Sequence, residues 1–141
     1  MPATEPISVR GVRLIELQEI VGDNGRLIVA EAPVGLPFAA TRIFTLMNIP
    51  EGEARGTHAH RRCEQFLICM SGSVTAVVDD GTRHQELVLD RPTVGLYMPA
   101  LTWGTQYGYS SDAMLVVLAS DPYDADDYIE DYDEFLKLAS A

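Results

Sequence analysis

Positive charge, cysteine and long apolar segments are all scarce in this chain of 141 residues. Its 10 lysines and arginines face 21 aspartates and glutamates, which gives a formal net charge of -11. Nucleic acids and anionic membranes are themselves negative, so we expect neither to be a partner of the surface as a whole. A phosphorylated small molecule is not excluded, because a few arginines can be gathered in one cleft.

The scarcity of long apolar segments and of cysteine also limits where the protein acts. No run of about 18 apolar residues occurs, so no segment is expected to span a membrane. The first residues lack the charged segment followed by an apolar segment that marks a secretory signal. Cys63 and Cys69 lie in what the pattern predicts to be one strand, about 20 Å apart and too far for a disulfide. Free thiols and the missing signal predict a cytoplasmic protein.

Many short segments of alternating character are present, about 8 to 12 residues apart and separated by Gly, Pro and Asp. The clearest turn signals are Gly22-Asp23-Asn24-Gly25 and Asp79-Asp80-Gly81. Strands are expected within residues 9–29, 41–49, 53–70, 73–79, 84–90, 93–100 and 113–120, with a loop over 103–112. This pattern predicts an all-β fold, an antiparallel sandwich or barrel of the jelly-roll kind.

The chain changes character after Asp121. Residues 121–134, DPYDADDYIEDYDE, hold eight of the 21 carboxylates, which we interpret as a solvated face. Aromatic and apolar residues recur there at helical spacing, with acids at the start where a helix dipole favours them. We therefore expect one domain over 1–141, with a barrel over about 8–120 and one or two helices over about 122–138, packed on the barrel by aromatics. The short first strands are candidates for exchange between subunits, so a homodimer is expected.

The stretch from Glu53 to Gly72, EARGTHAHRRCEQFLICMSG, contains two histidines, His58 and His60, and Glu64 four residues later. Alternate residues of a strand share a face, so these side chains are expected together on the inner face of a sheet. They are then metal ligands, acid–base catalysts or structural histidines. Arginines at 55, 61 and 62 place positive charge beside a would-be metal site. We therefore favour free imidazoles acting as acid and base, without a metal.

Several motifs resemble a known family. Gly52, His58, His60 and Glu64 are similar to the first motif of the cupin barrels, whereas Gly104 stands where metal-binding cupins have a further ligand histidine. The segments RGTHAH (55–60), VGLY (94–97) and VLASD (117–121), together with Trp103, resemble the dTDP-4-keto-6-deoxyhexose 3,4-ketoisomerases. These are metal-independent cupins of deoxysugar biosynthesis. The resemblance extends from about residue 25 to 135 and implies a cupin-type jelly roll without a cofactor.

The resemblance also implies a reaction. The enzyme would convert dTDP-4-keto-6-deoxyglucose into a dTDP-3-keto-6-deoxyhexose through an enediol(ate), with His60 acting at carbon and His58 at the oxygens. Guanidinium groups suit a diphosphate best, and the candidates are Arg55, Arg42 and Arg26. The other expected substrate-binding residues are Glu64, Tyr97, Trp103 and Tyr107, of which Glu64 would contact a histidine or the pocket. For Trp103, packing in the core is an equal alternative, and for Tyr97, which lies in an apolar strand, a place in the core is also open.

Other functions stay open at this point. A metal-dependent cupin enzyme would use His58, His60 and Glu64 as a facial triad. A non-catalytic cupin would only bind the nucleotide sugar, and a related epimerase would exchange protons at C3 and C5. Phe44, Met47 and residues 104–107 depart from the family pattern as we know it, which leaves the configuration at C4 of the product open.

Overall fold

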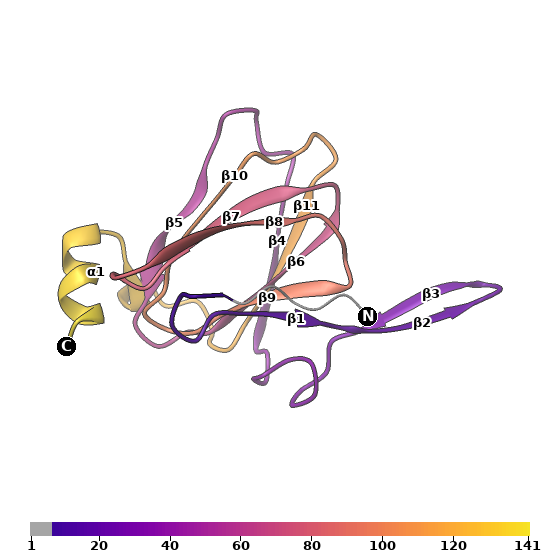
Figure 1. Cartoon of the computed structure of the whole chain (residues 1–141), viewed down its shortest axis with the longest axis horizontal. Helices are drawn as coiled ribbons and strands as arrows, with labels where there is room; N and C mark the ends of the chain where they lie inside the picture. Colours follow the sequence, from indigo (N-terminus) through magenta and orange to yellow (C-terminus); the bar gives the residue numbers. More distant parts are fainter. Residues whose placement is uncertain (1–6) are drawn as a thin grey trace.

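Two antiparallel sheets face each other in the computed structural model, which describes residues 7–141 (Figure 1). The first sheet contains, in spatial order, β1 (Arg13–Glu16), β9 (Val94–Met98), β6 (Gln65–Ser71), β11 (Met114–Ala119) and β4 (Arg42–Met47). The second contains β12 (Tyr128–Ile129), β5 (Arg55–His60), β10 (Trp103–Tyr107), β7 (Val74–Asp79) and β8 (His84–Leu89). From β4 to β11 the chain crosses repeatedly between the sheets, giving the orders 4-11-6-9 and 5-10-7-8. This is the jelly-roll arrangement, so the predicted fold is confirmed.

The main core lies between the two sheets. In β7 the burial alternates along the strand, and Val74, Ala76 and Val78 point inward with at most 1% exposure. Leu115 and Val117 of β11 meet them from the first sheet within the same cluster. Burial with a period of two thus places one face of each of these strands in the core, as expected for strand geometry.

A hairpin of β2 (Gln18–Gly22) and β3 (Gly25–Val29) extends from one end of the molecule (Figure 1). Its tip is the turn predicted at Asp23-Asn24. Apolar side chains of the hairpin face solvent, with Val21 69% and Leu27 58% exposed. β4, at the edge of the first sheet, also exposes Ile43, by 66%.

The prediction of one long strand over residues 53–70, which contain both histidines, is wrong. β5 ends at His60 and β6 begins at Gln65, and the two strands belong to opposite sheets. Residues 61–64 form the corner between them, so the residues after His60 do not continue the face of the two histidines. Cys63 lies in this corner and Cys69 in β6, and both thiols are free.

The prediction of a loop over residues 103–112 is also wrong, because β10 occupies the first half of this range. The inward positions of this strand are Gly104 and Gln106 rather than large apolar residues. Strand pairing with β5 and β7 therefore forms β10 without an alternating hydrophobic pattern in the sequence.

The C-terminal segment packs on the outside of the second sheet. It comprises a 3-10 helix (Ala125–Asp127), β12 and the helix α1 (Tyr132–Ala139). Phe135 of α1 is fully buried, and its ring lies 5.6 Å from that of Trp103. The expected aromatic packing is thus present, although the α-helix is limited to 132–139 and Tyr128 belongs to a strand. No helix among the described residues has the length and apolar character needed to cross a membrane.

Candidate active site

A β-bulge in β5 turns two functional side chains toward the same cavity. β10 residue Gly104 pairs with His58 and Gln106 pairs with Arg55, so three steps along β5 oppose two along β10. The extra residue lies at Gly56 and Thr57, whose φ angles are 93° and 27°. In a regular strand, residues three apart point to opposite faces. Because the bulge inserts one residue between Arg55 and His58, their side chains point to the same face instead. Both Arg55 and His58 therefore line the cavity.

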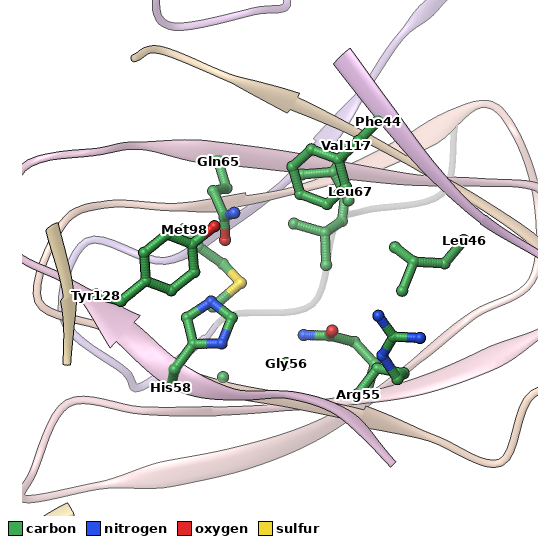
Figure 2. A pocket seen from close by; sticks show the side chains of 12 residues that line it. Phe44, Leu46, Arg55, Gly56, His58, Gln65, Leu67, Met98, Val117 and Tyr128 are labelled. Carbon is green, nitrogen blue, oxygen red and sulfur yellow. The ribbon is translucent and has the colours of Figure 1, made fainter. Parts of the chain in front are cut away.

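The cavity has a volume of about 230 Å³ and lies between the two sheets. Apart from Gln65, its lining is apolar on the side of the first sheet, and the polar residues come from the other side. The lining comprises Phe44, Leu46, Arg55, Gly56, His58, Gln65, Leu67, Met98, Gly104, Gln106, Val117 and Tyr128. Figure 2 shows the His58 ring beside Tyr128 and Met98, with Arg55 at the other end next to Leu46. An apolar pocket with a few convergent polar groups is typical of a small-molecule site.

A chain of hydrogen bonds connects the cavity to a buried carboxylate. Nε2 of His58 lies 3.1 Å from Nε2 of His60, and Nδ1 of His60 lies 2.9 Å from Oδ2 of Asp127. The Asp127 carboxylate also accepts the backbone N–H groups of Arg62, at 2.7 Å, and Cys63, at 3.3 Å. An ionised Asp127 holds the proton of His60 on Nδ1. This leaves Nε2 of His60 as an acceptor that faces His58, the ring that lines the cavity.

Burial sets the protonation state of this chain. Burial, together with a smaller effect of the neighbouring His60, lowers the pKa of His58 to about 4. Burial also lowers the pKa of His60, while the bond to Asp127 opposes that change. For Asp127 burial alone would raise the pKa, but hydrogen bonds from the Arg62 backbone and from His60 lower it overall. Near neutral pH both imidazoles are therefore uncharged and Asp127 is ionised, which is the state a general base requires.

The three arginines predicted to bind substrate lie in different places. Arg55 lines the cavity and makes no ion pair within residues 7–141. Arg42 stacks on Phe44, 5.3 Å from the ring centre, and its charge contributes to lowering the pKa of His60. Its Nε is buried without a partner in the described part of the chain. Arg26 lies on the extended hairpin, where it pairs with Glu19, and is far from the lining of the cavity.

None of the remaining four predicted residues lines the cavity. Glu64 accepts a hydrogen bond from the Tyr97 hydroxyl instead of contacting a histidine. Tyr97 belongs to a second apolar cluster with Phe38. Trp103 packs against α1 rather than into the pocket. Tyr107 is at the surface and donates to Glu86.

The placement of Glu64 also bears on the metal alternative. The donor atoms that lie within 4.8 Å of one another belong to His60, Cys63 and Asp127, not to the predicted set of His58, His60 and Glu64. In this group Nδ1 of His60 is already bonded to Asp127. The arrangement is better suited to orienting an imidazole than to a facial triad with open positions.

Four polar residues of the site were not predicted: Asp127, Tyr128, Gln65 and Gln106. Asp127 was included in the acidic segment interpreted as a solvated face, but it is only 3% exposed. The interpretation was wrong there because the 3-10 helix and β12 fold this part of the segment against β5. The alternation in Asp127-Tyr128-Ile129 was a usable signal of a short strand. In the structure Asp127 and Ile129 are buried, and Tyr128 between them faces the cavity.

Comparisons with known proteins agree with this geometry. The model of the family described as "FdtA: WxcM-like, C-terminal" matches residues 10–140. A TDP-4-oxo-6-deoxy-alpha-D-glucose-3,4-oxoisomerase from Aneurinibacillus thermoaerophilus is 40% identical over 125 residues, which cover 89% of this chain and 90% of that protein.

Solved structures are similar over nearly the whole chain. The WlaRB TDP-quinovose 3,4-ketoisomerase of Campylobacter jejuni superposes with a TM-score of 0.88 at 38% identity, covering 92% of this chain and 99% of that one. The 3,4-ketoisomerase QdtA of Thermoanaerobacterium thermosaccharolyticum, as a histidine-to-asparagine variant in complex with TDP-4-keto-6-deoxyglucose, gives a TM-score of 0.90. The identity is 31%, and the match covers 94% and 96% of the two chains.

Proposed function

This chain belongs to the FdtA family and is a 3,4-ketoisomerase, and from that premise we propose that it converts TDP-4-keto-6-deoxyglucose into a TDP-3-keto-6-deoxyhexose. TDP denotes thymidine diphosphate. The observation that carries the proposal is the chain from Asp127 through His60 to His58, which ends at a cavity that Arg55 also lines.

The reaction exchanges a ketone and an alcohol between neighbouring carbons. A base takes the hydrogen of C3, which is acidified by the C4 ketone, and the electron pair of the C3–H bond forms the C3–C4 double bond of an enediol(ate). The former carbonyl oxygen at C4 gains a proton. The hydroxyl at C3 then loses its proton to become the new ketone, and C4 accepts a proton. Atoms and charge balance without any oxidant or reductant.

His60 is proposed as the group that moves the proton at carbon. Its Nδ1 is held by the buried Asp127 carboxylate, which stabilises the imidazolium formed when Nε2 takes a proton. Asp127 acts here as a positioning residue and does not itself touch the sugar. A correctly oriented base of this kind contributes typically 10²- to 10⁴-fold to the rate.

His58 is proposed to exchange protons with the oxygens of the sugar. It lines the cavity, and its Nε2 lies within hydrogen-bond distance of Nε2 of His60. A proton can therefore pass between the two rings during one turnover. Its low pKa, about 4, keeps His58 uncharged at neutral pH, so that it can both accept and donate.

The diphosphate is proposed to bind at the Arg55 end of the cavity. Arg55 is a cation without an ion-pair partner among residues 7–141, and a guanidinium suits a diphosphate. Arg42 remains a second candidate, because its charge acts on His60 from the start of β4. Positive charge near the enediolate oxygens lowers the barrier to proton removal.

The decisive test of the function is an NMR analysis of the product formed from TDP-4-keto-6-deoxyglucose. We expect the ketone at C3 with the other ring carbons unchanged, and the coupling constants of the C4 proton give the configuration there. A product that keeps its ketone at C4 but is inverted at C3 or C5 would contradict the proposal and identify an epimerase. Unchanged substrate together with tight binding would favour a non-catalytic sugar-binding protein.

We also propose that two copies form a symmetric dimer and that the enzyme acts in the cytoplasm. The exposed apolar residues of the hairpin and the edge of β4, which is unpaired among residues 7–141, favour pairing with a second copy, because an open sheet edge is a template for another chain. Sedimentation velocity tests this: a dimer is expected, and Val21→Lys should shift it toward monomer. The two free thiols support a reducing compartment.

A further inference from the structure

Gln106 is a buried polar residue of the cavity with no role in the proposed proton transfer. It is 8% exposed, and its side chain lines the cavity from β10. Within residues 7–141 its amide takes part in no side-chain hydrogen bond, although a primary amide offers two donors and an acceptor. The amide is accessible from the cavity, so its donors and its acceptor are available to a ligand.

Two glycines hold this amide in place. A Cβ at Gly56 would lie 2.7 Å from Oε1 of Gln106, and one at Gly104 would lie 3.5 Å from its Nε2. The amide therefore packs directly on the backbone of the β5 bulge. Gln106 pairs with Arg55 in register, while Gly104 pairs with His58. Because the side chain leans from its own position toward Gly104, the amide lies between the levels of Arg55 and His58.

This order along the cavity matches the order of groups on the substrate. If the histidines act at C3 and C4 and Arg55 binds the diphosphate on C1, the amide faces the stretch of the ring between C3 and C1. The hydroxyl on that stretch is the one at C2, and a hydroxyl can both donate to and accept from an amide. The ring oxygen, on the other path between these carbons, only accepts.

We propose that the Gln106 amide binds the C2 hydroxyl of the hexose and so selects 2-hydroxy sugars over 2-deoxy sugars. This inference rests on the proposed function, because it takes the position of the sugar from the histidines and Arg55. The bulge in β5 then has two roles. Besides turning Arg55 and His58 into the cavity, the backbone at Gly56 supports the residue that recognises the neighbouring carbon.

The experiment measures binding by calorimetry with two ligands that carry a hydroxyl at C4 and therefore do not react, TDP-glucose and TDP-2-deoxyglucose. We expect the wild type to bind TDP-glucose about fivefold more tightly, the effect of one neutral hydrogen bond. In Gln106→Leu this preference should vanish, with both ligands bound as weakly as the wild type binds the 2-deoxy compound. Gln106→Met, a second apolar replacement, should behave in the same way.

The controls separate this inference from the function on which it rests. Thr105→Val changes the opposite face of the same strand and should keep the preference. TDP alone should bind equally to the wild type and all variants. If the wild type has no preference, or Gln106→Leu retains it, the assignment of Gln106 is wrong while the proposed function stands. If the wild type binds neither TDP nor TDP-glucose, the proposed substrate is wrong and the assignment fails with it.

Discussion

The two edges of strand β10 differ sharply. On one edge β10 pairs with β7 in unbroken register, from Trp103 opposite Asp79 to Tyr107 opposite Thr75. On the other edge it pairs with β5 through a bulge at Gly56 and Thr57. The regular partner contributes valines and an alanine to the core, whereas the irregular partner contributes an arginine and a histidine to the cavity. Within one sheet, regular pairing thus provides stability and a local irregularity provides the chemistry.

This difference has a simple physical origin. A regular strand sends every second side chain to the core, and polar side chains there would be buried without partners. The bulge allows two polar residues three positions apart to share one side, at a place where a cavity rather than a packed core receives them. We therefore expect substitutions on the β5 edge to change catalysis and those on the β7 edge to change stability.

The largest expected effect is on the β5 edge. His60→Asn removes the proposed carbon base, and kcat should fall about 10²- to 10⁴-fold, while the midpoint of thermal unfolding changes little. Steady-state kinetics and a melting curve measure the two quantities on the same preparation. A kcat within threefold of the wild type would remove His60 from the proposed mechanism.

The next effect concerns the carboxylate that orients this base. Asp127→Asn should lower kcat on the order of 100-fold, because the amide no longer stabilises the imidazolium. Asp127 raises the pKa of His60, so its removal lowers that pKa, and the acidic limb of kcat/KM should move to lower pH. Asp126→Asn, at the exposed neighbouring position, is the matched control and should leave the profile unchanged. A limb that moves to higher pH contradicts the assignment.

On the β7 edge the effect should be on stability alone. Val78 is fully buried opposite Gly104, and Val78→Ala removes two methyl groups from the core. The free energy of unfolding should fall by about 2 kcal/mol in urea titrations, with kcat within twofold of the wild type. If kcat instead falls tenfold while stability is kept, the proposed division between the two edges of β10 does not hold.

The smallest expected effect is a pH dependence of the free energy of unfolding that is caused by His58 of β5. The pKa of His58 is lowered to about 4 in the folded state, against an ordinary value of 6.5. Between these values the unfolded chain binds the proton and the folded one does not, so stability is lost as the pH falls from 6.5 toward 4. Allowing for partial exposure, the loss is about 1–2 kcal/mol. His58→Asn should flatten this part of the curve, and an unchanged slope would show that His58 does not cause it.

Much of the fold was predictable from the sequence because regular strands follow a simple period. The many short apolar segments, among them residues 74–79 and 113–120, and turn signals such as Asp79-Asp80-Gly81 indicated an antiparallel jelly roll. The spacing of His58 and His60 predicted that both rings share one face. The corner at 61–64 was not predictable in this way, since the charged residues there continue the apparent alternation into β6.

The site itself was less accessible to sequence reasoning. The bulge at Gly56 leaves only a single glycine as a signal, yet it decides that Arg55 faces the cavity. In the sequence Asp127 looks like any other residue of an acidic segment, but the 3-10 helix and β12 place it against His60. Gln106 lies in a strand with no apolar alternation. Each of these depends on pairing between distant segments, which local pattern does not encode.

The most direct test of the central claim is the position of deuterium after the reaction in heavy water. If His60 takes the C3 proton, and this proton exchanges with solvent at the two histidines before C4 is protonated, NMR should find solvent deuterium in the product at C4 and none at C5, and His60→Asn should abolish its incorporation. Deuterium at C5, or incorporation by His60→Asn at the rate of the wild type, would contradict the account.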